Sequence, residues 1–556
     1  YDGQSVVRLR TSSNTSILSA VFHHSDNHEG GAGLRLYHTK SDNEGLTWSQ
    51  PTPIEESLAF PSHDGYQLVD PTSNMTRSFL FYGYNKPTLH YKDRDGNHVN
   101  LTRGDMQLIE GFRFRRSRPS GSYAGTVRHT IPVRRTAIDQ NNPWGGAVMG
   151  AFQCDTPQVI GGAIYFAFQK TQEGGGETPG SEVFFMRSRD LLKFALFADS
   201  KDEDLQKATW ETLPLGDRGL QAPEGKLALG EEPHIIQVGT DNPHRLMSFW
   251  RCEVGKIACT YSNDGGEHWE ATRWLTYDGS PLGRPLKNPR GSLTPHPFHD
   301  GSVLLVWYNN GHTEREGYVG RRLYWICIGK PTAGAHALIQ WSQPELCLWW
   351  DGPEYADRPG WNPDWAIVDG PGYPDFVELD DDRQNTRIAF IQSNKITLRF
   401  HILDHRMLTL LRQVWNCEGA LRSQIVLPAP VLTVPCPSGK NHYRGPNLPD
   451  LAGTGGGYTV MMWVKGLASA FAVEPEQIIC SSMETITAAI DEEDTGSFIT
   501  KGFEVKVVGH GNEGLQAQLR VSDGVHSFKI RSDGLDWDGN WHQLTFVLDV
   551  GPRLGT

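Results

Sequence analysis

Long apolar runs are missing from this sequence. No stretch approaches the roughly 20 consecutive apolar residues that a helix needs to cross a bilayer, and the opening residues, YDGQSVVRLR, hold no signal-like hydrophobic segment. The chain also begins without Met. We therefore expect a processed or trimmed soluble protein with no membrane span.

Positive charge is scarcer than negative charge. The 556 residues include 52 Lys and Arg against 65 Asp and Glu, which gives a formal net charge of −13 at pH 7. Because a protein needs a basic face to displace counterions from a phosphate backbone, this balance argues against nucleic acid as a partner. A local basic pocket is still compatible with this net charge. The length favours more than one domain.

Metal-binding patterns are absent from the sequence as well. No Cys pair has the CxxC spacing of a zinc site, and no DxDxDG-like run suggests a calcium loop, so we expect neither a metal nor another cofactor. The eight Cys are instead an even number, which predicts some disulfides of open connectivity. Three pairs are close in sequence: Cys252 with Cys259, Cys327 with Cys347, and Cys417 with Cys436.

Three Asn-x-Ser/Thr tripeptides indicate where the protein is found. Asn14, Asn74 and Asn100 each begin one, and each would accept a glycan in a eukaryotic secretory route. A single tripeptide is a weak signal. Three of them in a chain that is compatible with disulfides favour a secreted, extracellular glycoprotein.

Helical patterns are rare in the first 420 residues, where the one strong candidate is DHRMLTLLRQVW at 404–415. Short apolar or alternating runs recur instead, such as SILSAVF, SFLFYGY, AIYFAF, VLLVWY and RIAFIQ, separated by clusters of Gly, Asp, Asn and Pro. Strands this short and this regularly spaced predict an all-β fold, which is a sandwich, a barrel or a propeller.

A repeated octamer bears on that choice. SNDGGEHW at 262–269 and SDNEGLTW at 41–48 share Ser, Asp or Asn, Gly and Trp at the same offsets, whereas MRSRDLLKF keeps only Ser188 and Asp190. We expect the Asp or Asn to cap its own backbone, the Gly to take a positive φ, and the Trp to pack against a neighbouring element. The alternative is that these are two chance hairpins.

The octamers resemble the Asp-box of the sialidase superfamily, whose members are β-propellers. This resemblance implies a β-propeller over residues 1–420, six-bladed as in sialidases. Such boxes occur in many propellers, so they indicate a fold and not a reaction.

The resemblance extends to an ordered set of candidate site residues. QSVVRLR resembles the family's opening Arg strand, with Arg8 in the Arg position and Arg10 as the alternative. HRLMSFWRC resembles its second Arg strand and supplies Arg251, and YVGRRLYWICI offers Arg321. By resemblance, these three arginines would bind the carboxylate of a substrate.

The catalytic candidates follow from the same resemblance. GEEPHIIQV maps Glu232, GYPDFVELDDD maps Tyr373 as nucleophile, and the loop HHSDNHEGGAG supplies Asp26 as acid/base, with Glu29 behind it. The implied enzyme is a retaining exo-glycoside hydrolase that removes sialic acid or a related keto-acid sugar from a glycoconjugate. A neutral phenol activated by a Glu suits an anomeric carbon beside a carboxylate, which would repel an anionic nucleophile.

Departures from the family pattern keep other functions open. One octamer has Asn in place of Asp, the Arg strand lacks its usual Pro, and a Trp-rich insertion separates Arg321 from Tyr373. A propeller polysaccharide lyase acting on a uronate-containing glycan is the first alternative, with His63 or a Tyr as base. An exo-arabinanase-like hydrolase and a non-catalytic carbohydrate-binding propeller are the others.

The composition changes after the helical candidate. A stretch rich in Pro and Gly is interpreted as a linker or a first irregular strand. GGYTVMMWVKG and DGNWHQLTFVLD then resemble strands of laminin-G or concanavalin-like domains. This resemblance implies a jelly-roll β-sandwich at 421–556, which either binds carbohydrate or buttresses its neighbour. The chain ends just after a strand that such domains usually follow with others, so we expect a missing C-terminal part or a short module.

Overall fold

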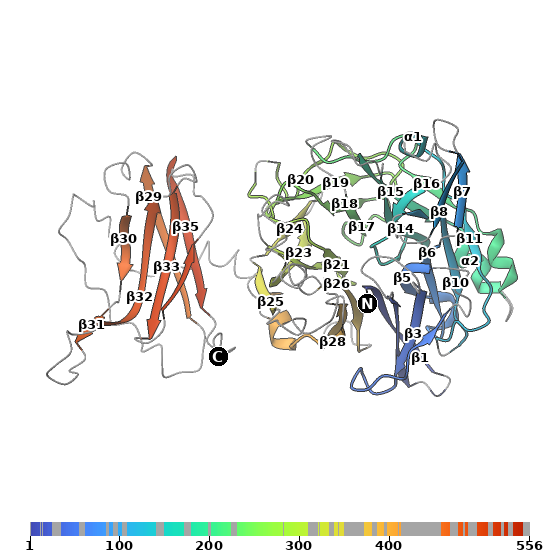
Figure 1. The fold of residues 1–556 in the computed structure, drawn as a ribbon, viewed down its shortest axis with the longest axis horizontal. Coiled ribbons are helices and arrows are strands. Elements are labelled where there is room, and N and C mark those ends of the chain that lie inside the picture. The colour runs from blue at the N-terminus through green and yellow to red at the C-terminus, as the bar shows by residue number, and fades with distance from the viewer. Residues whose placement is uncertain are drawn as a thin grey trace. The chain divides into compact units, whose positions relative to one another are not determined.

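The computed structural model forms two compact units, Tyr1–Pro428 and Ala429–Thr556 (Figure 1). In the first unit it describes residues 2–11, 13, 15–24, 35–54, 62–84, 88–92, 98–102, 108–109, 111–119, 121–140, 149–171, 180–197, 202–223, 231–281, 283–309, 321, 323–332, 338–342, 344–349, 372–380, 386–393, 397–409 and 411–412. In the second unit it describes residues 458–467, 476–481, 484–487, 498–509, 515–523, 527–531 and 538–548.

Six antiparallel sheets, here called blades, make up most of the described part of the first unit. Blade 1 consists of β1 (Asp2–Arg10), β2 (Ser16–His24), β3 (Arg35–Ser41) and β4 (Thr52–Pro53). Blade 2 consists of β5 (Ser62–Val69), β6 (Ser78–Tyr84), β10 (Gly111–Arg116) and β11 (His129–Ile131). Blade 3 consists of β12 (Met149–Phe152), β14 (Ala163–Thr171), β15 (Ser181–Ser188) and β16 (Glu211–Leu213), joined by β9 (Leu108–Ile109) and β13 (Gln158–Ile160).

The other three blades repeat this pattern. Blade 4 consists of β17 (Glu231–Gln237), β18 (Leu246–Arg251), β19 (Ile257–Ser262) and β20 (Arg273–Trp274). Blade 5 consists of β21 (Leu293–Pro297), β22 (Val303–Tyr308), β23 (Leu323–Pro331), β24 (Ile339–Trp341) and β25 (Glu345–Trp349). Blade 6 consists of β26 (Gly372–Glu378), β27 (Ile388–Ser393) and β28 (Leu398–Ile402).

A separate hairpin and several short helices complete the described part of this unit. The hairpin is β7 (Thr88–Lys92) with β8 (His98–Thr102). The helices are α1 (Ala137–Gln140), α2 (Leu191–Phe197) and the 3-10 turns η1 (Pro71–Ser73) and η2 (Glu203–Lys207). Residues 405–409 and 411–412 are also helical, which confirms the helix predicted near residue 410.

Apolar layers between neighbouring blades close the sheets into a ring. Each of six buried clusters draws its side chains from two adjacent blades, in the order 1–2, 2–3, 3–4, 4–5, 5–6 and 6–1. In the last cluster, Val6 and Ala20 of blade 1 pack with Val377 and Ala389 of blade 6. Burying apolar area on both faces of every sheet is the main stabilising contribution here. The first unit is therefore a six-bladed β-propeller, as the resemblance implied.

A β-bulge recurs at the start of four innermost strands: β1, β5, β17 and β26. In each case three residue steps on the inner strand face two steps on its partner, so one residue is extra. The residue after the last pair before the register shift has a left-handed φ near 50° in all four, namely Gly3, Asp64, Glu232 and Tyr373. Bulges redirect side chains. The bulge therefore redirects side chains near the beginning of each of these four strands, and the four beginnings lie at the same end of the propeller.

The two octamers adopt the turn that their sequences predict. In SNDGGEHW, Asp264 Oδ1 accepts the backbone N–H of His268 at 3.0 Å, and Gly266 has a φ of 89°. The indole of Trp269 donates to the Gly266 carbonyl at 2.9 Å and stacks on Phe185 of blade 3, with ring centroids 4.7 Å apart. Because the Trp contacts the preceding blade, the octamer joins neighbours as well as closing a turn.

SDNEGLTW repeats this arrangement between β3 and β4. Asn43 Oδ1 accepts the backbone N–H of Thr47 at 2.9 Å, and Trp48 contacts Phe400 of blade 6. The degenerate copy is different, because its Ser188 hydroxyl accepts the N–H of Leu191 at the start of α2. The sequence MRSRDLLKF thus continues into a helix that the strand pattern did not predict.

Two of the three Cys pairs that are close in sequence are not disulfides in this structure. Cys259 packs in the apolar layer between blades 4 and 5, whereas Cys252 packs between blades 3 and 4. Cys327 and Cys347 likewise lie in different layers. The sequence left the connectivity open, and these two candidate pairings are excluded because each pair is divided between the two faces of one sheet. Cys417 and Cys436 lie outside the described residues.

The second unit contains two antiparallel sheets among its described residues. One pairs β29 (Tyr458–Leu467) with β35 (Asp538–Leu548). The other contains β30 (Glu476–Ser481), β31 (Glu484–Thr487), β32 (Phe498–Gly509), β33 (Leu515–Asp523) and β34 (Ser527–Arg531). The sandwich at 421–556 and its role stay predictions. In neither unit is any described helix both long and apolar enough to span a membrane.

His129 gives the propeller a testable acid sensitivity. Its ring is buried, stacks on Phe114 at 4.7 Å, and has no hydrogen-bond partner among the described residues. Burial, with a smaller effect of Arg115, lowers the pKa of His129 to about 4. The unfolded chain takes up this proton near pH 6.5, so stability falls as the pH drops from 6.5 toward 4, by on the order of 2 kcal/mol.

We therefore expect His129→Phe to stabilise the protein, and more so at pH 4.5 than at pH 8. Urea unfolding at both pH values measures this difference. An equal gain at the two pH values would show that the ring is not the acid-sensitive group.

Candidate active site

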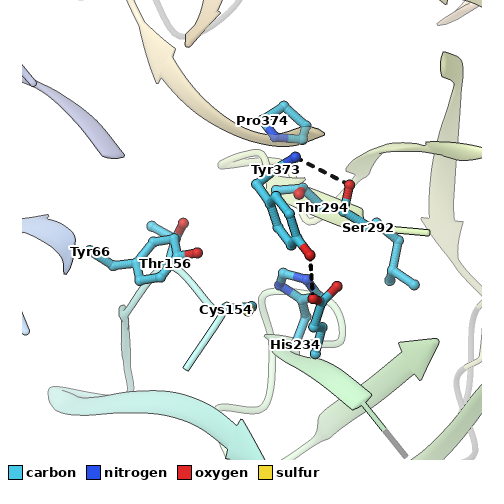
Figure 2. Close-up of a pocket in the computed structure, with 10 residues that line it drawn as sticks. Tyr66, Cys154, Thr156, His234, Ser292, Thr294, Tyr373 and Pro374 are labelled. Carbon is cyan, nitrogen blue, oxygen red and sulfur yellow. Dashed lines mark hydrogen bonds between the residues drawn. The ribbon is translucent and has the colours of Figure 1, made fainter. Parts of the chain in front are cut away.

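A pocket lies at the axis of the propeller, where the inner strands begin (Figure 2). Its lining comes from five blades: Tyr66 of β5, Cys154 and Thr156 after β12, Glu232 and His234 of β17, Ser292 to Thr294 at β21, and Tyr373 and Pro374 of β26. Inner strands converge on a common axis, so residues far apart in sequence meet there. This is the end at which the bulges occur.

Tyr373 and Glu232 form the central contact of this pocket. The Tyr373 hydroxyl donates to Glu232 Oε1 at 2.5 Å, drawn as a dashed line in Figure 2. Both residues occupy the left-handed bulge position, with φ of 49° and 50°. A left-handed φ is uncommon outside glycine and costs about 1 kcal/mol or more, so surrounding contacts have to hold it.

Those contacts come from the neighbouring blades. The Gln4 amide of β1 donates to the carbonyls of Gly372, at 2.9 Å, and of Tyr373. The Tyr373 N–H donates to the Ser292 hydroxyl at 3.2 Å, and the Glu232 N–H donates to Gln169 Oε1 at 2.5 Å. The backbone of the Tyr373 and Glu232 pair is thus fixed from outside its own strands.

Arg251 completes this arrangement. Its Nη1 lies 2.8 Å from Glu232 Oε2 and 3.5 Å from the Tyr373 hydroxyl. Burial raises the pKa of Glu232, and Arg251 and the Tyr373 hydrogen bond oppose that rise. Glu232 is therefore a carboxylate with raised proton affinity, in direct contact with the proton of a phenol. Such a pair can move a proton off Tyr373 as its oxygen attacks a substrate.

Glu231, the preceding residue, has the opposite electrostatics. Burial would raise its pKa, but Arg251 and Arg290 lower the pKa of Glu231 to about 2. Arg251 contacts Glu231 Oε2 at 3.2 Å, and Arg290 bonds both of its oxygens at 2.8 Å. Two adjacent carboxylates whose environments push their pKa values apart have different roles, and only Glu232 suits proton transfer.

The structure brings four of the residues predicted from sequence together. Tyr373, Glu232 and Arg251 are in contact. Arg321 lies beside them, because its Nη2 donates to the Arg290 carbonyl and its charge acts on both Glu231 and Glu232.

Arg8 is not part of this cluster. Its Nε donates to the Ser16 hydroxyl at 3.0 Å, and its charge acts on Glu44 and on Asp380, beyond the far end of β26. The residue of β1 that reaches Tyr373 is Gln4, about 13 Å earlier along the strand at 3.3 Å per residue. The prediction that Arg8 belongs to the site is therefore wrong. The resemblance of QSVVRLR to the family strand did not fix which residue of β1 lies beside Tyr373.

Three other predicted residues cannot be placed. Asp26 and Glu29 lie outside the described residues. The Trp-rich insertion at 341–365 is described only at its beginning, where Trp341 ends β24 and Glu345–Trp349 form β25. His63 belongs to β5, but its side chain is also outside the described part. Their roles stay predictions.

Sequence reasoning missed a buried histidine in the pocket. His234 Nδ1 lies 3.0 Å from Asp155 Oδ1, and both side chains are buried. Burial raises the pKa of Asp155, and the hydrogen bond with His234 opposes this. The motif EEPH contained a signal, since His234 follows Glu232 by two positions in a strand. No described group of three or more His, Cys, Asp or Glu side chains is arranged to bind a metal.

No family model matches this chain, and no curated protein matches it. The solved structures that it resembles include sialidases. They include an intramolecular trans-sialidase from leech, at 14% identity over 74% of this chain and 68% of that one, with a TM-score of 0.42. The intramolecular trans-sialidase from Ruminococcus gnavus has 14% identity, coverages of 72% and 94%, and a TM-score of 0.40. Trypanosoma rangeli sialidase has 10% identity, coverages of 98% and 90%, and a TM-score of 0.41.

Identities and TM-scores this low do not transfer an activity.

The two adjacent glutamates supply a test of the site that needs no substrate. We expect the Glu232 carboxyl to titrate above its ordinary value of 4.5 and the Glu231 carboxyl to stay ionised down to about pH 2. Carboxyl carbon NMR of glutamate-labelled protein would resolve the two signals, with Glu231→Gln and Glu232→Gln assigning them. Titration of both groups near 4.5 would contradict the assigned electrostatics.

Proposed function

We propose that this protein is a retaining exo-glycoside hydrolase of sialidase type, which removes a terminal acidic sugar from a glycoconjugate. The observation that carries the proposal is the 2.5 Å contact between the Tyr373 hydroxyl and Glu232, with Arg251 beside both. Sialidases are a known exception to the two-carboxylate pattern of glycosidases because their nucleophile is a tyrosine.

In the first step, the Tyr373 oxygen attacks the anomeric carbon while Glu232 takes the phenolic proton. The glycosidic bond breaks, and its oxygen leaves with a proton from the acid, for which Asp26 is the candidate. Water, deprotonated by the same acid/base, then cleaves the tyrosyl glycoside, and the proton on Glu232 returns to Tyr373. Arg251 stabilises the charge that develops on the phenol oxygen, since it lies 3.5 Å away.

Substrate selection falls to Arg251 and Arg321 in this proposal. Planar guanidinium groups hold a carboxylate more specifically than Lys does, because they donate two parallel hydrogen bonds. Arg8 lies too far along β1 to take part. The acidic-sugar preference thus depends on two of the predicted arginines rather than three.

We also propose that the protein acts outside the cell. Asn74, one of the three predicted glycan acceptors, is exposed in a left-handed turn after η1. A glycan could be attached there without disturbing the propeller core. Soluble glycans and glycoconjugates are the partners that this location offers.

Replacing Tyr373 tests the nucleophile. We expect Tyr373→Phe to lose at least about a thousandfold in turnover of α-sialosides or related keto-acid glycosides, because the attacking oxygen is removed. Fluorophore release measures this loss. Tyr165→Phe is the matched control, since its hydroxyl bonds the Gly265 carbonyl away from the pocket.

A fluorinated acidic-sugar fluoride, which slows breakdown of a covalent intermediate, should add its glycosyl mass to the peptide that contains Tyr373. Turnover that survives in Tyr373→Phe would refute the proposal. Release of neutral arabinosides alone would favour an exo-arabinanase-like hydrolase, and ligand binding without any turnover would favour a carbohydrate-binding propeller.

A polysaccharide lyase is a second candidate, and His234 is the observation that favours it. A lyase needs a base for the proton next to a uronate carboxylate, and a His held by a buried Asp is a suitable one. His234 lines the pocket and bonds Asp155 at 3.0 Å, so it replaces His63 as the candidate base.

The hydrolase proposal predicts no ultraviolet-absorbing unsaturated product from uronate-bearing polysaccharides. The lyase candidate predicts such a product, unaffected by Tyr373→Phe and lost in His234→Asn. Measuring absorbance with both variants therefore decides between the two reactions.

A further inference from the structure

Arg290 lies just before β21 and contacts Glu231, Glu253 and Arg321. Its Nε and Nη2 bond the two oxygens of Glu231 at 2.8 Å, and its Nη1 lies 3.1 Å from Glu253. Each of its three nitrogens therefore contacts a carboxylate. Its side chain is largely buried, so these bonds are shielded from water and fix the guanidinium in one plane.

The backbone of Arg290 is also held in an unusual conformation. Its φ of 57° is left-handed. Asn288 closes a turn around it, because Asn288 Oδ1 accepts the Gly291 N–H at 2.8 Å and its amide donates to the Gly291 carbonyl at 3.1 Å. The Arg290 carbonyl points to Arg321 and accepts a hydrogen bond from its Nη2. Strain of this kind persists only where surrounding contacts determine it.

Glu231 extends the influence of Arg290 to the second guanidinium. Its Oε2 accepts from Arg251 Nε at 3.2 Å and lies 3.2 Å from Arg251 Nη2. Two nitrogens of Arg251 are thus held by Glu231, which leaves Nη1 facing Glu232 and the Tyr373 hydroxyl. The orientation of Arg251 follows from the orientation of Glu231, which Arg290 fixes.

We propose that Arg290 is the positioning residue of the anion-binding site, orienting Arg251 through Glu231 and Arg321 through its own carbonyl. In this role Arg290 acts on the substrate through Arg251 and Arg321, while its own nitrogens bond Glu231 and Glu253. This proposal rests on the proposed function insofar as Arg251 and Arg321 bind a sugar carboxylate. Arg290 thereby determines, through Arg251 and Arg321, the specificity for an acidic sugar.

Loss of Arg290 should weaken binding of the anion more than it slows the chemistry. In Arg290→Gln we expect KM for an acidic-sugar glycoside to rise about tenfold or more, with kcat falling less than about threefold. Arg290→Lys should recover only part of the affinity, because Lys keeps the charge but not the planar fork. The Kd of the free acidic sugar for Tyr373→Phe, with and without Arg290→Gln, should show the same loss.

Arg187→Gln is the matched control. Arg187 is also buried and also bonds two carboxylates, Glu211 and Glu267, but it lies in blade 3 away from the pocket. Its replacement should lower thermal stability and leave KM unchanged. An unchanged KM and Kd in both Arg290 variants would overturn the proposal, as would an equal rise in KM for Arg187→Gln.

Failure of the proposed function would be recognised separately, as wild-type protein that turns over no acidic-sugar glycoside. In that case, nitrogen NMR of the arginine Nε–H groups still decides the positioning role. A protected Arg251 signal that is lost in Arg290→Gln but kept in Arg187→Gln would support it, because Arg251 Nε donates to Glu231. Signals unchanged in Arg290→Gln would overturn it.

Discussion

The β-bulge at the start of the inner strands is the constraint on which the rest of the site depends. A regular strand would point successive side chains to alternate faces of its blade. The extra residue, held at a left-handed φ, breaks this alternation at Glu232 and Tyr373. Two strands from different blades can then direct a carboxylate and a phenol toward one point. The same bulge carries Gly3 and Asp64 in blades 1 and 2, so the site uses a general feature of this ring.

Buried hydrogen bonds at the axis hold these bulges in place. Asp375, two residues after Tyr373, accepts from the Ser5 hydroxyl and the Val6 N–H at 2.7 Å and from the Thr156 hydroxyl at 2.6 Å. Two residues after Glu232, His234 is also held by a buried hydrogen bond, because its Nδ1 lies 3.0 Å from Asp155 Oδ1. Buried polar groups are costly unless satisfied, and satisfied networks specify one arrangement. The axis is therefore polar and ordered, whereas the layers between blades are apolar.

Local sequence patterns predicted the strands well and predicted contacts between blades poorly. SFLFYGY and VLLVWY coincide with β6 and β22, because alternation and turn residues act within one segment. Glu232, Arg251 and Tyr373 were found because each sits in a short recognisable strand. Arg8 was misplaced because nothing in QSVVRLR marks the bulge that sets the register of β1. Arg290 and Asp155 act through partners in other segments, which no local pattern contains.

The ring closes between its first and last blades, and this has a consequence for how the protein is made. Among the described residues, no strand of blade 1 pairs into the sheet of blade 6; side chains join them, through the apolar layer at Val6 and Val377 and the ion pair of Glu44 with Arg387. Gln4 reaches Tyr373 across this seam. During synthesis, the first blade must therefore wait for nearly 400 residues before its partner exists. A chain that ends after blade 4 contains Glu232 and Arg251 but not Tyr373, so the pocket is assembled only once blade 6 is complete.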